Sequence, residues 1–268
     1  MKVNTEIVKH YLNGISSSDY SDSWIFHSIE EGQYLFEEPD PEQIPIITQM
    51  VEEIQAQLDP FLPFNQDLWN TLFPMAASRL QKVTIQLVVG CPSPYGAMVR
   101  TASDGSETII FDLIRMSCYK SAQNDVSEII RKMLTHECAH LLLHQDYPES
   151  EANTYREKLS YLLFDEGLAH FLAMDEQVNN YDWTSSETLE QKEKAFHDFS
   201  EAYKEENSDQ QKQNLINACA GAFWDKFACI AGMFRFADIY QMNRRAGIKS
   251  AYQKGWIDFS NELLKKVG

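Results

Sequence analysis

The chain has 268 residues, 44% of them hydrophobic, and its 23 basic and 40 acidic side chains give a formal net charge of −17 at pH 7. A chain of this length and composition can bury a sizeable core. The acidic balance disfavours binding to nucleic acid or to anionic membranes through a general basic surface. We therefore expect a soluble protein without a nucleic-acid or membrane partner.

Targeting and redox features are sparse. Residues 1–10 contain no apolar core of signal-peptide length. No later run approaches the roughly 18 apolar residues of a membrane helix. The five cysteines, at positions 91, 118, 138, 219 and 229, are odd in number and widely spaced, so they do not suggest a disulfide framework. These features predict a reducing, cytoplasmic location.

The region before residue 80 is predicted to be helical. Helices are expected at about residues 41–58 and 66–80, and prolines at positions 41, 45, 60 and 63 break the region into short units. This part of the chain would form a lobe or a cover.

Three strands are predicted next, at residues 82–89, 95–100 and 107–113, separated by turn signals. Gly96 and Ala97 have two interpretations. Their small side chains would let another backbone approach an edge strand, or the glycine simply occupies a hairpin turn. The strands lead into a long, apolar-rich helix.

This helix, expected at residues 123–145, contains the sequence His136-Glu137-Cys138-Ala139-His140. Residues four apart lie on one face of an α-helix, about 5–6 Å from each other, so both histidines can bind one ion. A catalytic zinc typically has three protein ligands and an open position for water. The Glu137 carboxylate can flank the ion without binding it, which suits a general base. Cys138 points away from this face and is predicted to be a small buried side chain.

Three residues compete to be the third ligand. Asp146 lies ten residues after His136, where one branch of metallopeptidases has its ligand, but that geometry needs a glycine three residues earlier and this chain has leucine there. His144 lies on the same helical face as His136, but an axial offset of about 12 Å is too large for one ion. Glu166 lies in an apolar helical stretch, residues 152–175, where a carboxylate without a partner is costly. A bound metal would remove that cost.

Together, His136, Glu137, His140 and Glu166 resemble the site of the gluzincins, the thermolysin-like zincin metallopeptidases whose third ligand is a glutamate on a following helix. The run Glu-Gly-Leu-Ala that begins at Glu166 looks most like small predicted zinc peptidases of that group. The resemblance implies one zinc ion per chain, held by the two histidines and Glu166, with Glu137 as the general base.

The chain departs from the family one helical turn after the glutamate. The family often has an acidic residue there that supports a zinc-binding histidine, and this chain has His170. The imidazole of His170 can still orient a ligand or solvent. No Gly-x-Met-Glu-Asn run of the aminopeptidase branch is present.

The resemblance also implies a fold of the α+β class. It would be mainly helical and zincin-like, with a small mixed or antiparallel sheet before the active-site helix and an edge strand that offers backbone groups to an extended peptide. We expect a single metallopeptidase-like unit. Its parts would be a helical N-terminal region (1–80), the sheet with the two site helices (81–175) and a helical C-terminal lobe (176–268).

The C-terminal lobe begins with a polar segment. Residues 187–213 are rich in lysine, glutamate and glutamine and predict either an exposed helix or a partly mobile insertion. Residues 218–240 are apolar and are predicted to be helical. Gly247 and Gly255 would divide them from a last helix that ends near residue 266.

A hydrolase of this kind also needs a donor for the oxyanion that forms when water attacks a carbonyl. The candidates are Tyr240, Tyr252, Arg235 and His170. Each has a plainer interpretation, because tyrosines in mixed helices are usually core residues with a wet hydroxyl and arginines usually form surface ion pairs. Tyr240 and His170 are retained as catalytic candidates beside Glu137.

The favoured function is zinc-dependent hydrolysis of a peptide bond, with Glu137 passing a proton from water to the leaving amine. A second hypothesis is a non-catalytic zinc module that docks a protein partner, which needs a fourth ligand from His144 or His170. A third is a helical binding protein without metal, which leaves a buried Glu166 unexplained. The expected partner is a peptide or protein substrate, and the sequence does not indicate an oligomeric state.

Overall fold

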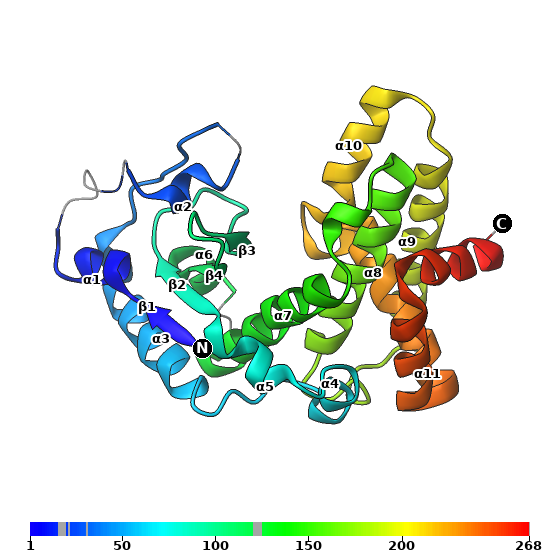
Figure 1. Ribbon diagram of the computed structural model, residues 1–268, viewed down its shortest axis with the longest axis horizontal. Helices are drawn as coiled ribbons and strands as arrows, with labels where there is room; N and C mark the ends of the chain where they lie inside the picture. The colour runs from blue at the N-terminus through cyan, green and yellow to red at the C-terminus, as the bar shows by residue number, and fades with distance from the viewer. Residues whose placement is uncertain (16–19, 21, 31, 120–124, 268) are drawn as a thin grey trace. The chain divides into compact units, whose positions relative to one another are not determined.

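The computed structural model describes residues 1–15, 20, 22–30, 32–119 and 125–267. The chain is mostly helical with one small mixed sheet, which confirms the α+β class (Figure 1). It divides into two compact units. The first comprises Met1–Pro63 and Met75–Leu141, and the second Phe64–Pro74 and Leu142–Gly268.

The sheet of the first unit has four strands in the order β1-β2-β4-β3. Strands β1 (Lys2–Asn4), β2 (Thr84–Val88) and β4 (Glu107–Asp112) run parallel, and β3 (Ala97–Thr101) pairs antiparallel with β4. The three predicted strands are confirmed with slightly different ends. Strand β1 was missed, because three residues are too few to show the alternation that predicts a strand.

Burial explains the strand order. Every residue of β2 after Thr84 and every residue of β4 after Glu107 is buried, so both faces of the two central strands are covered. Such strands have nearly continuous apolar sequences, as is typical of parallel pairs. In the edge strand β3 only Met98 is buried, and the polar Arg100 and Thr101 remain accessible.

Helix α7 has residues in both units, and apart from α3 the helices that lie wholly in the first unit are short. They are α1 (Glu6–Leu12), α2 (Trp24–His27), α3 (Ile44–Gln57, preceded by the 3-10 turn Pro41–Gln43), α5 (Ala76–Arg79, continued by the 3-10 turn Leu80–Lys82) and α6 (Leu113–Ser117). The helix predicted at 66–80 is therefore wrong as a single element. Phe73 is non-helical (φ −124°, ψ 65°) because the following Pro74 disfavours the α conformation.

Helix α7 (Val126–Asp146) carries the histidine motif over 21 residues. Its predicted start at residue 123 lies outside the described residues, and its end is one residue later than predicted. The backbone N–H of Tyr147 still donates to the carbonyl of Leu143 (2.7 Å), so the helix continues through the position where a turn would need glycine. Pro148 follows and cannot extend the helix.

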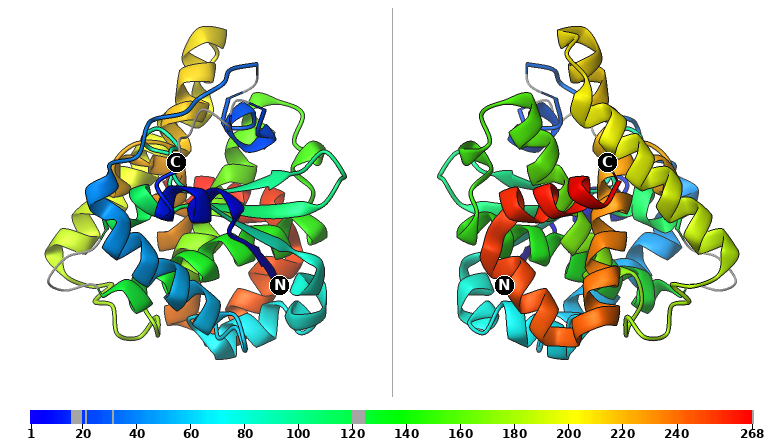
Figure 2. Two further views of the ribbon diagram at one scale, coloured as in Figure 1. Left: turned by 90° about the vertical axis from the view of Figure 1, so that its left-hand side faces the viewer. Right: turned by 90° about the vertical axis from the view of Figure 1, so that its right-hand side faces the viewer.

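The second unit is helical. It contains α4 (Gln66–Leu72), α8 (Tyr155–Ala173), α9 (Ser186–Lys204), α10 (Ser208–Cys219) and α11 (Phe227–Val267), with 3-10 turns at Glu149–Glu151 and Phe223–Asp225. The polar segment 187–213 thus forms parts of two helices. Helix α11 bends where Arg244 and Gly255 leave the helical region, so the predicted break at Gly255 is confirmed and the one at Gly247 is not (Figure 2).

Helices α8 and α11 approach to backbone contact at two glycines. A β-carbon on Gly232 would lie 1.8 Å from the carbonyl oxygen of Leu163, and one on Gly167 would lie 2.5 Å from the α-carbon of Gly232. Because no side chain fits between the backbones, the glycine of the Glu-Gly-Leu-Ala run is explained by this crossing.

We expect Gly232→Ala to lower the free energy of unfolding by about 1–3 kcal/mol or more, because the two helices must separate. Gln213→Ala, on an exposed face of α10, should change it by less than about 0.5 kcal/mol. Urea denaturation of both variants measures the difference. Equal stabilities would contradict the crossing.

Asp112 ends β4 and caps α6. Its carboxylate is fully buried and accepts the backbone N–H groups of Cys91 (2.7 Å) and Arg115 (2.9 Å). Burial raises the pKa of Asp112 to about 6, although the two hydrogen bonds act in the opposite direction. The folded state therefore binds this proton more tightly than the unfolded state does.

The stability that the protonated Asp112 contributes should be complete below about pH 4 and be lost as the pH rises to about 6. The difference in unfolding free energy between the wild type and Asp112→Asn, which cannot ionise, should fall over this range by up to about 3 kcal/mol. Denaturation series at several pH values measure it. A difference that rises with pH would contradict the raised pKa.

Candidate functional site

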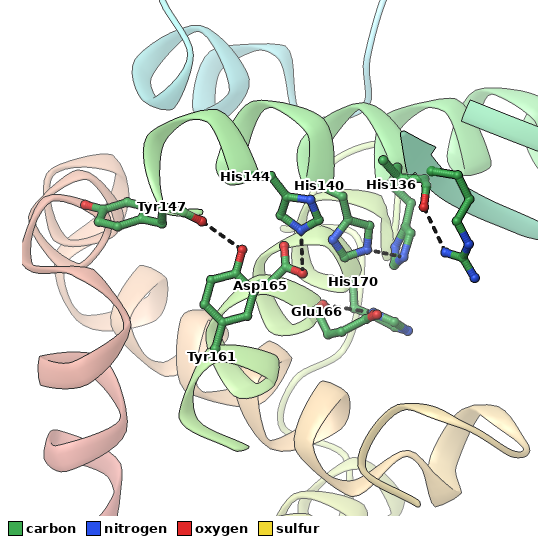
Figure 3. Close-up of polar contacts among 10 residues, drawn as sticks. His136, His140, His144, Tyr147, Tyr161, Asp165, Glu166 and His170 are labelled. Carbon is green, nitrogen blue, oxygen red and sulfur yellow. Dashed lines mark hydrogen bonds and ion pairs between the residues drawn. The ribbon is translucent and has the colours of Figure 1, made fainter. Parts of the chain in front are cut away.

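The two motif histidines face each other on α7. Their Nε2 atoms are 3.0 Å apart, and their rings meet edge to face at 4.6 Å between centroids (Figure 3). This follows from the spacing of four residues, which places both side chains on one helical face. His140 is 6% exposed and Glu137, between them in sequence, is 5% exposed. As predicted, Cys138 is fully buried, with its Sγ 3.8 Å from the Sδ of Met1.

Glu166 of α8 completes a group of three possible metal ligands. One ligand atom each from His136, His140 and Glu166 lies within 4.8 Å of the others. Two nitrogens bound tetrahedrally to zinc at about 2.0–2.1 Å would be about 3.4 Å apart, close to the observed Nε2 separation. Two such nitrogens with lone pairs repel unless a proton or a cation lies between them. The donor set and its spacing therefore fit a zinc ion.

The neighbouring Asp165 binds a different histidine. Its Oδ2 atom is 3.1 Å from Nε2 of His144, and the two residues form a further group with His140 within 4.8 Å. His144 was predicted to be too far from His136 to share its ion, and it lies outside the group of His136, His140 and Glu166. Burial raises the pKa of Tyr161, and the negative charge of Asp165 raises it further.

His170 contacts Glu166 directly. Its Nδ1 atom is 2.9 Å from the backbone carbonyl oxygen of Glu166 and 3.4 Å from the carboxylate Oε2 (Figure 3). The imidazole is 8% exposed and lies against the ring of Phe223, with centroids 5.6 Å apart.

Cys229 of α11 belongs to the same surroundings. Its Sγ lies within 4.8 Å of ligand atoms of Glu166 and His170, and its thiol donates to the carbonyl oxygen of Ala218 (3.4 Å). Burial, and then the charge of Glu166, raise the pKa of Cys229 well above its ordinary value. We therefore expect a neutral thiol at neutral pH.

Asp146, the alternative third ligand, has another role. It accepts a hydrogen bond from the hydroxyl of Tyr252 (2.6 Å). It belongs to none of the possible metal groups found among the described residues. Tyr252, an oxyanion candidate, is correspondingly engaged by this carboxylate.

The other two oxyanion candidates have structural contacts. The Tyr240 hydroxyl accepts from Nδ2 of Asn179 (3.4 Å), and its ring packs on Phe171 (6.0 Å between centroids). Arg235 is 6% exposed and pairs with Glu262 (2.7 Å). Neither set of contacts includes a predicted zinc ligand, so the catalytic role of Tyr240 stays a prediction.

Three residues of this environment were missed in the sequence. The sequence could have indicated a role for Asp165, because a second carboxylate in an apolar helix needs a partner of its own. Phe223 and Cys229 had none, since they come from distant segments that only the folding of the second unit brings to α8.

Comparisons with protein-family models, curated proteins and solved structures find no match to this chain. Within the described ranges, no helix combines the length and apolar character needed to cross a membrane. The function is therefore inferred from the residues and their geometry.

We expect the purified protein to bind one zinc ion. Residues that only orient metal ligands typically control metal affinity by roughly 10–100-fold. Glu166→Ala removes a proposed ligand itself, so it should weaken zinc binding by more than this. Asp146→Asn, which keeps an acceptor for Tyr252, should bind zinc like the wild type. Isothermal titration of the metal-free protein measures both. Zinc binding that survives Glu166→Ala but not Asp146→Asn would assign the third ligand to Asp146.

Proposed function

We propose that the protein is a zinc-dependent hydrolase, and most specifically a gluzincin-type metallopeptidase that cleaves peptide bonds. The observation that carries the proposal is the pair of facing histidines on α7, which forms a group of possible metal ligands with the carboxylate of Glu166. This set of two histidines and one glutamate, with a position left for water, is that of catalytic zinc sites.

Zinc in such a set lowers the pKa of water to about 7 and polarises a carbonyl group. Glu137 follows His136 on α7 and is 5% exposed. Its carboxylate is suited to take the proton from the attacking water and to deliver it to the leaving amine. The same residue thus acts first as a base and then as an acid.

The peptide substrate is proposed from the resemblance and from the sheet. Strand β3 is the last strand in the order β1-β2-β4-β3 and begins with the small Ala97. An extended peptide can add to such an edge through backbone hydrogen bonds. A small mixed sheet, a motif helix and a following glutamate helix are also the elements expected of a zincin.

A closed, structural zinc site is less well supported. It needs a fourth protein ligand, and the two candidates have other partners: His144 binds Asp165, and Nδ1 of His170 lies against the backbone of Glu166. A non-catalytic module would also have no use for a buried Glu137 beside the histidines.

Glu137→Gln tests the chemistry separately from metal binding. The amide cannot accept the proton, so we expect cleavage of a mixed peptide library to fall by about 10²–10⁴-fold. Zinc content should stay at the wild-type level, because Glu137 is not a ligand. Mass spectrometry of the products and metal analysis of the same samples provide the two readouts. A zinc-loaded wild type that cuts no peptide, or an equally active Glu137→Gln, would contradict the peptidase proposal.

A further inference from the structure

We propose that His170 is a positioning residue for the third ligand. Its Nδ1 lies 3.4 Å from Oε2 of Glu166 and restrains this carboxylate, so that the side chain is already ordered when a metal ion binds it. The inference rests on the proposed zinc site, and it concerns how the chain prepares that site before metal arrives.

The contacts of Nδ1 determine where the proton of His170 lies. This nitrogen is 2.9 Å from the backbone oxygen of Glu166 and 3.4 Å from Oε2 of the same residue. A carbonyl and a carboxylate oxygen can only accept hydrogen bonds. Nδ1 must therefore carry the proton and donate it, which also prevents this nitrogen from binding a metal.

The surroundings hold the imidazole in this orientation. His170 lies one helical turn after Glu166, so α8 itself sets the distance between the two side chains. The ring is 8% exposed and packs against Phe223. The Sγ of Cys229 lies within 4.8 Å of ligand atoms of both residues. The donor is therefore fixed before any ligand binds.

Fixing Glu166 should raise metal affinity. A free glutamate side chain loses rotamer entropy when it becomes a ligand, and this loss weakens binding. A side chain that is already ordered loses less. Residues that orient metal ligands typically control affinity by 10–100-fold. In the resembled family the position of His170 supports a histidine ligand, whereas here the contact is to the glutamate.

Three substitutions of His170 test whether its Nδ1–H donor or merely the bulk of its ring is needed. His170→Asn keeps an N–H group at the place of Nδ1, His170→Gln moves the amide one atom further towards the place of Nε2, and His170→Leu removes both. We expect His170→Gln and His170→Leu to weaken zinc binding by about 10–100-fold, and His170→Asn to restore it to within roughly threefold of the wild type.

Zinc dissociation constants are measured by chelator competition on the full-length protein, with thermal unfolding of each metal-free variant as the control for folding. The visible spectrum of the Co²⁺-loaded protein is a second readout, because a reoriented carboxylate changes the ligand field. We expect the spectrum of His170→Asn to match the wild type and that of His170→Gln to differ. If His170→Leu does not fold, the Asn and Gln pair still decides.

Equal zinc affinity in all three variants would overturn the positioning role. Rescue by Gln and not by Asn would also overturn it, because the acting nitrogen would then be Nε2. Failure of the zinc proposal itself is distinguishable. In that case Glu166→Ala would bind zinc as well as the wild type, whatever the His170 variants do.

Discussion

The site depends on the cost of placing charge in an apolar helix. Helix α8 carries Asp165 and Glu166 side by side within a largely buried run. Asp165 is 5% exposed and cannot be left without a partner there, whereas the side chain of Glu166 is 22% exposed and is only partly shielded from water. Asp165 meets this requirement through His144, and Glu166 has His170 beside it. A metal ion bound to Glu166 would add positive charge beside its carboxylate. The same physical requirement accounts for the histidine beside each carboxylate.

Backbone packing supports this arrangement. The contact of α8 with α11 at Gly167 and Gly232 lies directly beside Glu166, and Cys229 precedes Gly232 by about one helical turn. The close approach of the two helices therefore brings α11 next to Glu166, the proposed metal ligand. A larger residue at either glycine would shift the helices that carry Glu166 and Cys229. Stability and site geometry are coupled at this crossing, whereas the buried Asp112 affects stability elsewhere, in the first unit.

Much of the site could be predicted because its signals are local. The spacing of His136 and His140 determines a shared helical face, and the apolar neighbours of Glu166 mark it as a carboxylate in need of a partner. The three main strands followed from short runs with apolar residues, separated by turn signals. The predictions that failed concern features that depend on single backbone positions or on contacts between distant segments. Pro74 breaks a predicted helix, Arg244 rather than Gly247 bends α11, and β1 is too short to have a pattern. The contacts of His170 with Phe223 and Cys229 have no local signal.

The central claim is that His136, His140 and Glu166 hold one zinc ion. Anomalous diffraction at the zinc edge, from crystals of the protein loaded with one equivalent of zinc, tests it most directly. The account predicts a single peak between the facing Nε2 atoms and the Glu166 carboxylate. A peak at His144 and Asp165, a peak at His170 and Cys229, or no bound zinc would contradict it.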